Sequence, residues 1–145
     1  MTTFPSGWDP DFPDQEDLLC ILIQSWLDDL TPAGEATTWL PKGYTADVDA
    51  GRVFVRVHRI GGRVDGLVDT GTIQIGVIAS TRRESWRVFG VIRSRLLEFG
   101  PDDIDGVPVG EITESTGPVQ IIDPQLNPDH RFVPGNFAVP CRKFR

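Results

Sequence analysis

Two stretches of alternating apolar residues constrain the fold of this chain more than any other feature. Between residues 53 and 57 every second residue is valine, and residues 72–79 alternate in the same way. Such alternation is typical of strands that bury one face. Because the stretches are close in sequence, we expect an antiparallel hairpin, with Gly61-Gly62 ending the first strand and a mobile loop over residues 63–69. The inward residues would be Val53, Val55, Val57, Ile73, Ile75 and Val77.

Two further segments space their apolar residues by three and four, as amphipathic helices do. The first covers residues 14–30, with Asp14 as N-cap. The second covers residues 80–100, with Ser80 or Thr81 as N-cap and a Gly-Pro pair to stop it. The expected buried stripes are Leu19, Leu22, Ile23, Trp26, Leu27 and Leu30 in the first helix, and Trp86, Phe89, Ile92, Leu96 and Phe99 in the second.

Two more strands are predicted toward the C-terminus, over residues 118–123 and 136–144. Pro140 cannot donate to a ladder, which predicts an edge position for the last strand. Residues 31–51 are interpreted as a connector and residues 101–110 as an acidic loop. The element order predicts an α+β fold, in which two helices pack on one face of a mainly antiparallel sheet of about four strands.

The first residues differ in character from the rest. Residues 1–13 place Phe4, Trp8 and Phe12 between prolines, whereas wholly disordered tails usually lack aromatic residues. We expect an extended arm that packs on a neighbouring surface, of this chain or another, or else a loosely attached terminus. Residues 14–145 fit one domain by length.

The charge balance limits the classes of partner. The net charge is −7 and the pI is about 4.7. Tight DNA binding depends on Lys and Arg that displace counterions, so a DNA-binding regulator is disfavoured, although a surface past which DNA slides is compatible with this charge. Cys20 and Cys141 fit buried thiols in a reducing cytoplasm. Residues 1–17 lack signal-peptide features and no apolar run reaches about 20 residues, so we expect a soluble protein with no membrane partner.

Asp69-Thr70-Gly71 has the sequence of the catalytic tripeptide of aspartic proteases. Those enzymes need two carboxylates that share a proton, so a chain with one copy would have to act as a homodimer. Two predicted helices do not suit a nearly all-β protease, and Asp, Thr and Gly are common where a loop enters a strand. We favour the loop-to-strand interpretation and keep the homodimeric protease that uses Asp69 as an alternative.

No other catalytic, cofactor or metal site is predicted. His58 is interpreted as a packed or surface strand residue and His130 as a solvated turn residue, and no Gly-x-Ser-x-Gly elbow is present. The spacings typical of metal sites and of phosphate-binding loops are also missing. We therefore expect a protein that is not an enzyme and that takes no cofactor.

The second helix carries an unusual concentration of positive charge. One interpretation is a solvated face with local ion pairs, such as Glu84 with Arg87. The other is that the arginines pair with acidic patches on identical neighbours, because unlike patches joined head to tail can close a ring. The residues concerned are Arg82, Arg83, Arg87, Arg93 and Arg95.

The central part of the chain resembles the tail-terminator, or tail-completion, proteins of long-tailed bacteriophages, especially those of actinobacterial hosts. The shared pattern is an apolar strand ending in "RIGG", a loop with Asp, an alternating strand, and after "AST" a helix from "RRESW" to "RSRLL". The segments "DLLCILIQSWL" and "GNFAVPCRKFR" also fit. The resemblance covers roughly Asp14 to Arg142 and leaves the arm outside.

The resemblance implies a structural virion protein at the head-proximal end of the tail, present in the host cytoplasm during assembly. Tail terminators form a ring, usually a hexamer, that caps the tail tube, ends its polymerisation and joins the tail to the head. The implied partners are other copies of the chain, the major tail tube protein and the head–tail connector, with DNA only passing through the lumen. A neck or connector protein is the alternative within the same class.

Three groups of residues are candidate contact surfaces under this resemblance. The arginines of the second helix are candidates for subunit contacts. Asp102, Asp103 and Asp105 are candidates for an acidic lumen that repels DNA. The candidates for contact with the tube or connector are Arg63, Asp65 and Asp69.

Overall fold

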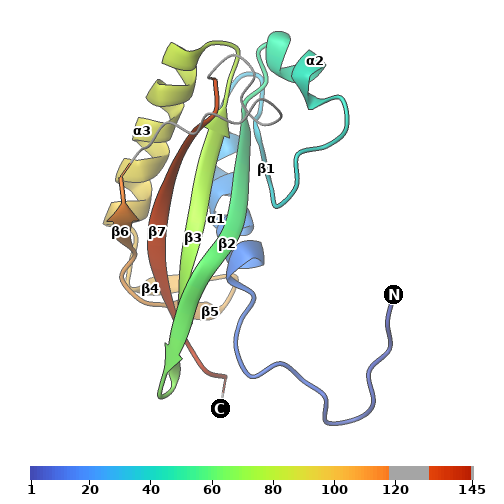
Figure 1. Cartoon of the computed structure of the whole chain (residues 1–145), viewed down its shortest axis with the longest axis vertical. Helices are drawn as coiled ribbons and strands as arrows, with labels where there is room; N and C mark the ends of the chain where they lie inside the picture. Colours follow the sequence, from blue (N-terminus) through green and yellow to red (C-terminus); the bar gives the residue numbers. More distant parts are fainter. Residues whose placement is uncertain (118–130, 145) are drawn as a thin grey trace.

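The two alternating segments form one long hairpin at the centre of the fold, as the computed structural model shows (Figure 1). The strands β2 (Phe54–Asp65) and β3 (Val68–Ile78) pair antiparallel along their whole length. Gly61-Gly62 does not end β2, and most of residues 63–69 continue the two strands rather than forming a loop. A register shift after Arg59 accommodates the glycines, because a bulge lets a strand bend and twist without losing its partner.

The sheet around this hairpin has more strands than predicted. In residues 1–117 and 131–144, which the structure describes, the sheet has seven strands. Six follow the order β1-β2-β3-β7-β5-β4, and the seventh, β6, pairs with β7. Only β1 runs parallel to its neighbour among these pairings. The added strands are β1 (Glu35–Thr37), β4 (Asp102–Ile104), β5 (Val107–Val109) and β6 (Thr113–Thr116).

The α+β class is therefore confirmed, but the sheet is mixed and larger than the four or so strands expected. Strands of three or four residues are too short to show alternation in a sequence. The segment 101–110 is largely the β4–β5 hairpin rather than an acidic loop. The strand predicted over residues 118–123 lies outside the described residues.

The last strand, β7 (Val133–Arg142), lies inside the sheet between β3 and the short strands β5 and β6. The edge position predicted from Pro140 was therefore wrong. In a strand, the N–H and C=O of one residue point to the same side. The Pro140 carbonyl accepts from the N–H of Gly110 at 2.9 Å, so the missing N–H of Pro140 faces away from β3 and the β3–β7 ladder is unaffected.

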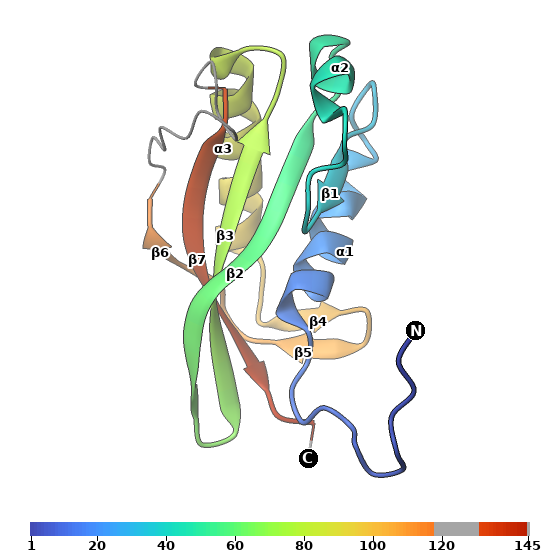
Figure 2. The same ribbon diagram turned by 45° about the vertical axis from the view of Figure 1, so that its right-hand side comes forward.

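The helices α1 (Gln15–Leu27) and α3 (Arg82–Glu98) cover one face of the sheet (Figure 2). Asp14 caps α1, as predicted, and Thr81 rather than Ser80 caps α3. The two helices and the sheet enclose the main core. Its members include the predicted residues Leu19, Ile23, Leu27, Val53, Val55, Val57, Ile73, Ile75, Val77, Phe89, Ile92 and Leu96. Trp86, expected in the stripe, is instead 40% exposed.

A third helix, α2 (Tyr44–Asp49), was not predicted within the connector. It supplies Val48 to a second, smaller core on the opposite face of the sheet, where Phe54 and Ile78 pair across the hairpin. Both faces of the hairpin are thus covered at the end where Phe54 pairs with Ile78. The two cores anchor β2 and β3 at this end.

The N-terminal arm leaves the body below α1 (Figure 1). Its base is attached to the C-terminal segment, because the Asp11 carbonyl accepts from the Phe144 N–H at 2.8 Å and Lys143 Nζ lies 3.4 Å from Asp11 Oδ2. Beyond this point Phe4 and Trp8 are 64% and 67% exposed. Residues 1–13 contain no helix or strand.

Candidate functional site

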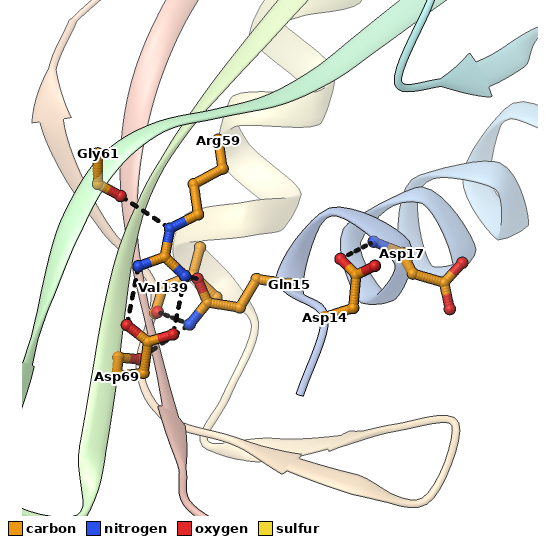
Figure 3. Close-up of polar contacts among 7 residues, drawn as sticks. All are labelled: Asp14, Gln15, Asp17, Arg59, Gly61, Asp69 and Val139. Atoms are coloured by element: carbon orange, nitrogen blue, oxygen red, sulfur yellow. Dashed lines mark hydrogen bonds and ion pairs between the residues drawn. The ribbon is translucent and has the colours of Figure 1, made fainter. Parts of the chain in front are cut away.

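Asp69-Thr70-Gly71 lies inside β3, where Asp69 forms a buried ion pair with Arg59 of β2 (Figure 3). Arg59 Nη1 and Nη2 each donate to one carboxylate oxygen at 2.8 Å. The Asp69 side chain is 7% exposed and that of Arg59 34%. The hydrogen bonds to Asp69 raise the pKa of the Arg59 guanidinium, because they stabilise its charged form.

Gln15, the first residue of α1, completes this cluster from above the sheet (Figure 3). Its Nε2 donates to the carbonyls of Asp69 at 2.8 Å and Val139 at 3.0 Å, and its Oε1 accepts from Arg59 at 3.3 Å. A Cβ at position 71 would overlap the amide of Gln15, so glycine is needed there for close approach. The tripeptide therefore fixes the start of α1 to β3 and β7.

This geometry does not resemble that of a catalytic carboxylate. Both oxygens of Asp69 accept from one guanidinium, and the Asp69 side chain is only 7% exposed. His58, on the same hairpin, has its Nδ1 3.7 Å from Glu16 Oε2. Within residues 1–117 and 131–144, no group of three His, Cys, Asp or Glu side chains could hold a metal ion. His130 lies outside these residues.

The five arginines of α3 do not share one environment. Arg93 donates to both oxygens of Glu114 on β6, at 2.6 and 2.9 Å, and this pairing raises its pKa. On the other flank, Arg95 lies 5.8 Å from the ring centroid of Trp26 in α1. Arg87 pairs with Glu84 at 2.9 Å, as expected for neighbours on a helix. Arg82 lies over the ring of Trp86, and Arg83 is exposed.

The acidic candidates and the tip of the long hairpin gather at the same end of the molecule (Figure 1). Asp102, Asp103 and Asp105 are exposed on the β4–β5 hairpin. Leu67, in the turn of the long hairpin, lines a pocket of about 350 Å³ together with Val107, Pro108 and the chain's last described residues. Three separate segments of the sequence thus form one end surface.

Arg63 and Asp65 are exposed near the tip of the long hairpin, whereas Asp69 is buried. Ile60, Val64 and Leu67 are exposed beside them. Contiguous exposed apolar residues commonly mark a contact surface for another protein. The hairpin tip has this character, and Asp69 acts inside the molecule.

A groove lies on the helical face, between the C-terminal end of α1 and α3. It has a volume of about 490 Å³, and its apolar lining includes Trp26, Leu30, Pro32, Val88 and Val91. Charged residues of both signs lie at its rim, namely Asp29, Glu84, Arg87 and Arg95.

Comparison with protein families gives one decisive match. The model of a phage tail termination protein family matches residues 11–145, which is nearly the whole chain. The chain belongs to the phage tail termination protein family. The resemblance inferred from the sequence pattern is thereby confirmed. Comparison with curated proteins gives no match.

Family membership places this tail termination protein among the structural components of bacteriophage virions. The match begins at residue 11, where the arm is attached to the C-terminal segment. In the described parts of the chain, no helix combines the length and apolar character required to cross a bilayer.

The cluster of Gln15, Arg59 and Asp69 was missed in the sequence, although one signal was present. Gly71 interrupts the β-branched residues of β3, and an isolated glycine in a strand indicates a bulge or a close approach. The amide partner could not be foreseen, because Gln15 lies 54 residues from Asp69.

Proposed function

We propose that this tail termination protein forms a closed ring, a hexamer, that caps the tail tube and ends its polymerisation. The same ring joins the tail to the head–tail connector. The proposal rests on family membership and on a surface that suits a protein acting through contacts. Asp69, in the Asp69-Thr70-Gly71 tripeptide, forms structural hydrogen bonds with Gln15 and Arg59. The proposed function therefore includes no chemical step on a substrate.

The end surface carries this proposal. It combines the exposed apolar tip of the long hairpin with the pocket beside Leu67. The tip of the hairpin lies beyond the two cores and exposes Ile60, Val64 and Leu67, so it is suited to contact a neighbouring ring. We assign Arg63, Asp65 and the apolar residues beside them to contact with the tube or connector.

Asp102, Asp103 and Asp105 are assigned to the lumen. They are exposed and close in sequence, so their negative potential adds up over a small area. A lumen of this sign repels DNA phosphates and lets DNA pass without sticking. The chain's net charge of −7 suits the same role.

We assign the arginines of α3 to contacts between copies of the protein. They are not equally suited to this role. Arg93 and Arg95 already have partners within the chain. Arg83 is exposed, and Arg87, although paired with Glu84, has a side chain that is 75% exposed, so these two are the residues best placed to meet an acidic patch of the next copy.

Tube growth in vitro tests the proposed function. Tube protein from the same phage is polymerised with and without this protein, and tube lengths are measured by electron microscopy. We expect shorter tubes, each with one ring of density at its end. Unchanged lengths would contradict termination, and binding to the connector alone would favour the neck-protein alternative.

A further inference from the structure

The α1–α3 groove and the N-terminal arm are complementary in chemistry. The groove exposes Val91, at 54%, and Leu30 beside the ring of Trp26. The arm offers Phe4 and Trp8, which flank Pro5 and are 64% and 67% exposed. Apolar, aromatic-lined grooves bind such proline-rich extended segments, because little conformational entropy is lost on binding.

Charge favours the same pairing. Residues 82–98 of α3 carry five arginines against two glutamates. The docking segment, residues 1–10, carries Asp9 and no lysine or arginine. The carboxylate of Asp9 is attracted to this helix, whose Arg87 and Arg95 line the groove together with Asp29 and Glu84.

The position of the groove favours binding of an arm from a neighbouring copy over binding of the chain's own arm. The arm leaves at the N-terminal end of α1, whereas the groove lies at the other end of this helix, about 20 Å away for 13 residues. In both views the arm projects from the side opposite to α3 (Figures 1 and 2). Its attachment at Asp11 holds the base of the arm on that side.

We propose that residues 1–10 of each copy dock into the α1–α3 groove of the next copy, with Phe4 and Trp8 as anchors. This inference rests on the proposed ring. Arm and groove are different surfaces, so the contact is head-to-tail, and repetition around a rotation axis closes a ring. Large aromatic anchors in a pocket carry most of the binding energy of such contacts.

A cross-linking experiment with full-length chains tests the arm directly. Chains with Ser6→Cys, which leaves both anchors in place, are mixed with chains with Val91→Cys, under mild oxidation and in the presence of growing tubes. The matched control replaces Val91→Cys by Lys42→Cys, an exposed position outside the groove. We expect cross-linking between positions 6 and 91 to be at least tenfold faster than between 6 and 42, because docking raises the effective concentration of the two thiols to about millimolar.

Equal rates for the two pairs would overturn the arm docking. A chain with both Ser6→Cys and Val91→Cys that cross-links internally at high dilution would overturn it too, since the arm would then occupy its own groove. If the wild-type protein stops tube growth and no cross-link forms in the capped tubes, the arm docking fails and the terminator proposal stands. A cross-link without any effect on tube length would support the arm and contradict termination.

Discussion

Asp69 shows how far the role of a residue depends on its neighbours. In isolation, Asp69-Thr70-Gly71 suggests a proteolytic carboxylate. In the fold, Arg59 holds both oxygens of Asp69, and Gly71 leaves room for Gln15. The residues that decide the role come from a second strand and from α1.

Replacing Asp69 therefore changes stability. We expect Asp69→Asn to lower the free energy of unfolding by about 1–3 kcal/mol, because the partly buried Arg59 loses its charged partner. Urea unfolding measures this change. Asp65→Asn, at an exposed position of the same hairpin, is the control and should remain within about 0.5 kcal/mol of wild type. Equal effects of the two substitutions would contradict the structural role of the Asp69–Arg59 pair.

The rate of alkylation of Cys20 should depend on pH. Burial, and after it the negative charges of Asp17, Glu16 and Asp14, raise the pKa of its thiol to about 11. A higher pKa leaves less thiolate, so alkylation of Cys20 at pH 8 should be about a hundredfold slower than for a thiol with the ordinary value. The rate should rise about tenfold per pH unit up to pH 10.

Mass spectrometry of the Cys20 peptide follows this reaction. Asp17→Asn should lower the pKa and speed the reaction, because a negative charge near the thiol is removed. The urea-unfolded chain serves as the reference for an unperturbed thiol. A rate in the folded protein equal to that reference would show that Cys20 is neither buried nor affected by the helix carboxylates.

At the scale of elements, the strongest signals were local. Asp14 and Thr81 cap the two long helices because their oxygens accept from the N–H groups of Asp17 and Glu84, and both caps could be predicted from residue type and position. The hairpin strands followed from alternation, but their full length did not, because a bulge after Arg59 carries β2 past the glycines.

The cap of α3 can be tested by two adjacent substitutions. Thr81→Ala should cost about 1 kcal/mol of unfolding free energy, because the N–H of Glu84 loses its acceptor at 3.1 Å. Ser80→Ala, one residue earlier and exposed, should cost much less. The comparison uses the midpoints of urea unfolding at equal slope. A larger loss of stability from Ser80→Ala than from Thr81→Ala would contradict the assignment of Thr81 as the cap of α3.

Other elements could not be predicted because their causes are long-range. The strands β4, β5 and β6 are ordered by pairing with each other and with β7 rather than by their own pattern. The strand β7 lies inside the sheet because β3 pairs with one side of it and β5 and β6 with the other, where the N–H of Gly110 also donates to the Pro140 carbonyl. The helix α2 forms where Val48 covers Phe54 from the far face.

At the scale of the whole molecule, the fold separates two kinds of surface. One end carries the hairpin tip and the acidic β4–β5 hairpin, and the helical face carries the groove and the arginines of α3. A ring protein needs both kinds, one for the rings above and below and one for its neighbours within the ring. The family match and this division together support a protein that acts by assembly.

Tail length in the virion tests this central claim most directly. Phage lacking the gene should make tails of uncontrolled, variable length, and complementation with the wild-type gene should restore a single length. Complementation with Asp69→Asn should restore that length too, because the proposed function gives Asp69 a structural role and not a catalytic one. Tails of normal, uniform length in the absence of the gene would contradict the proposal that this protein ends tube growth.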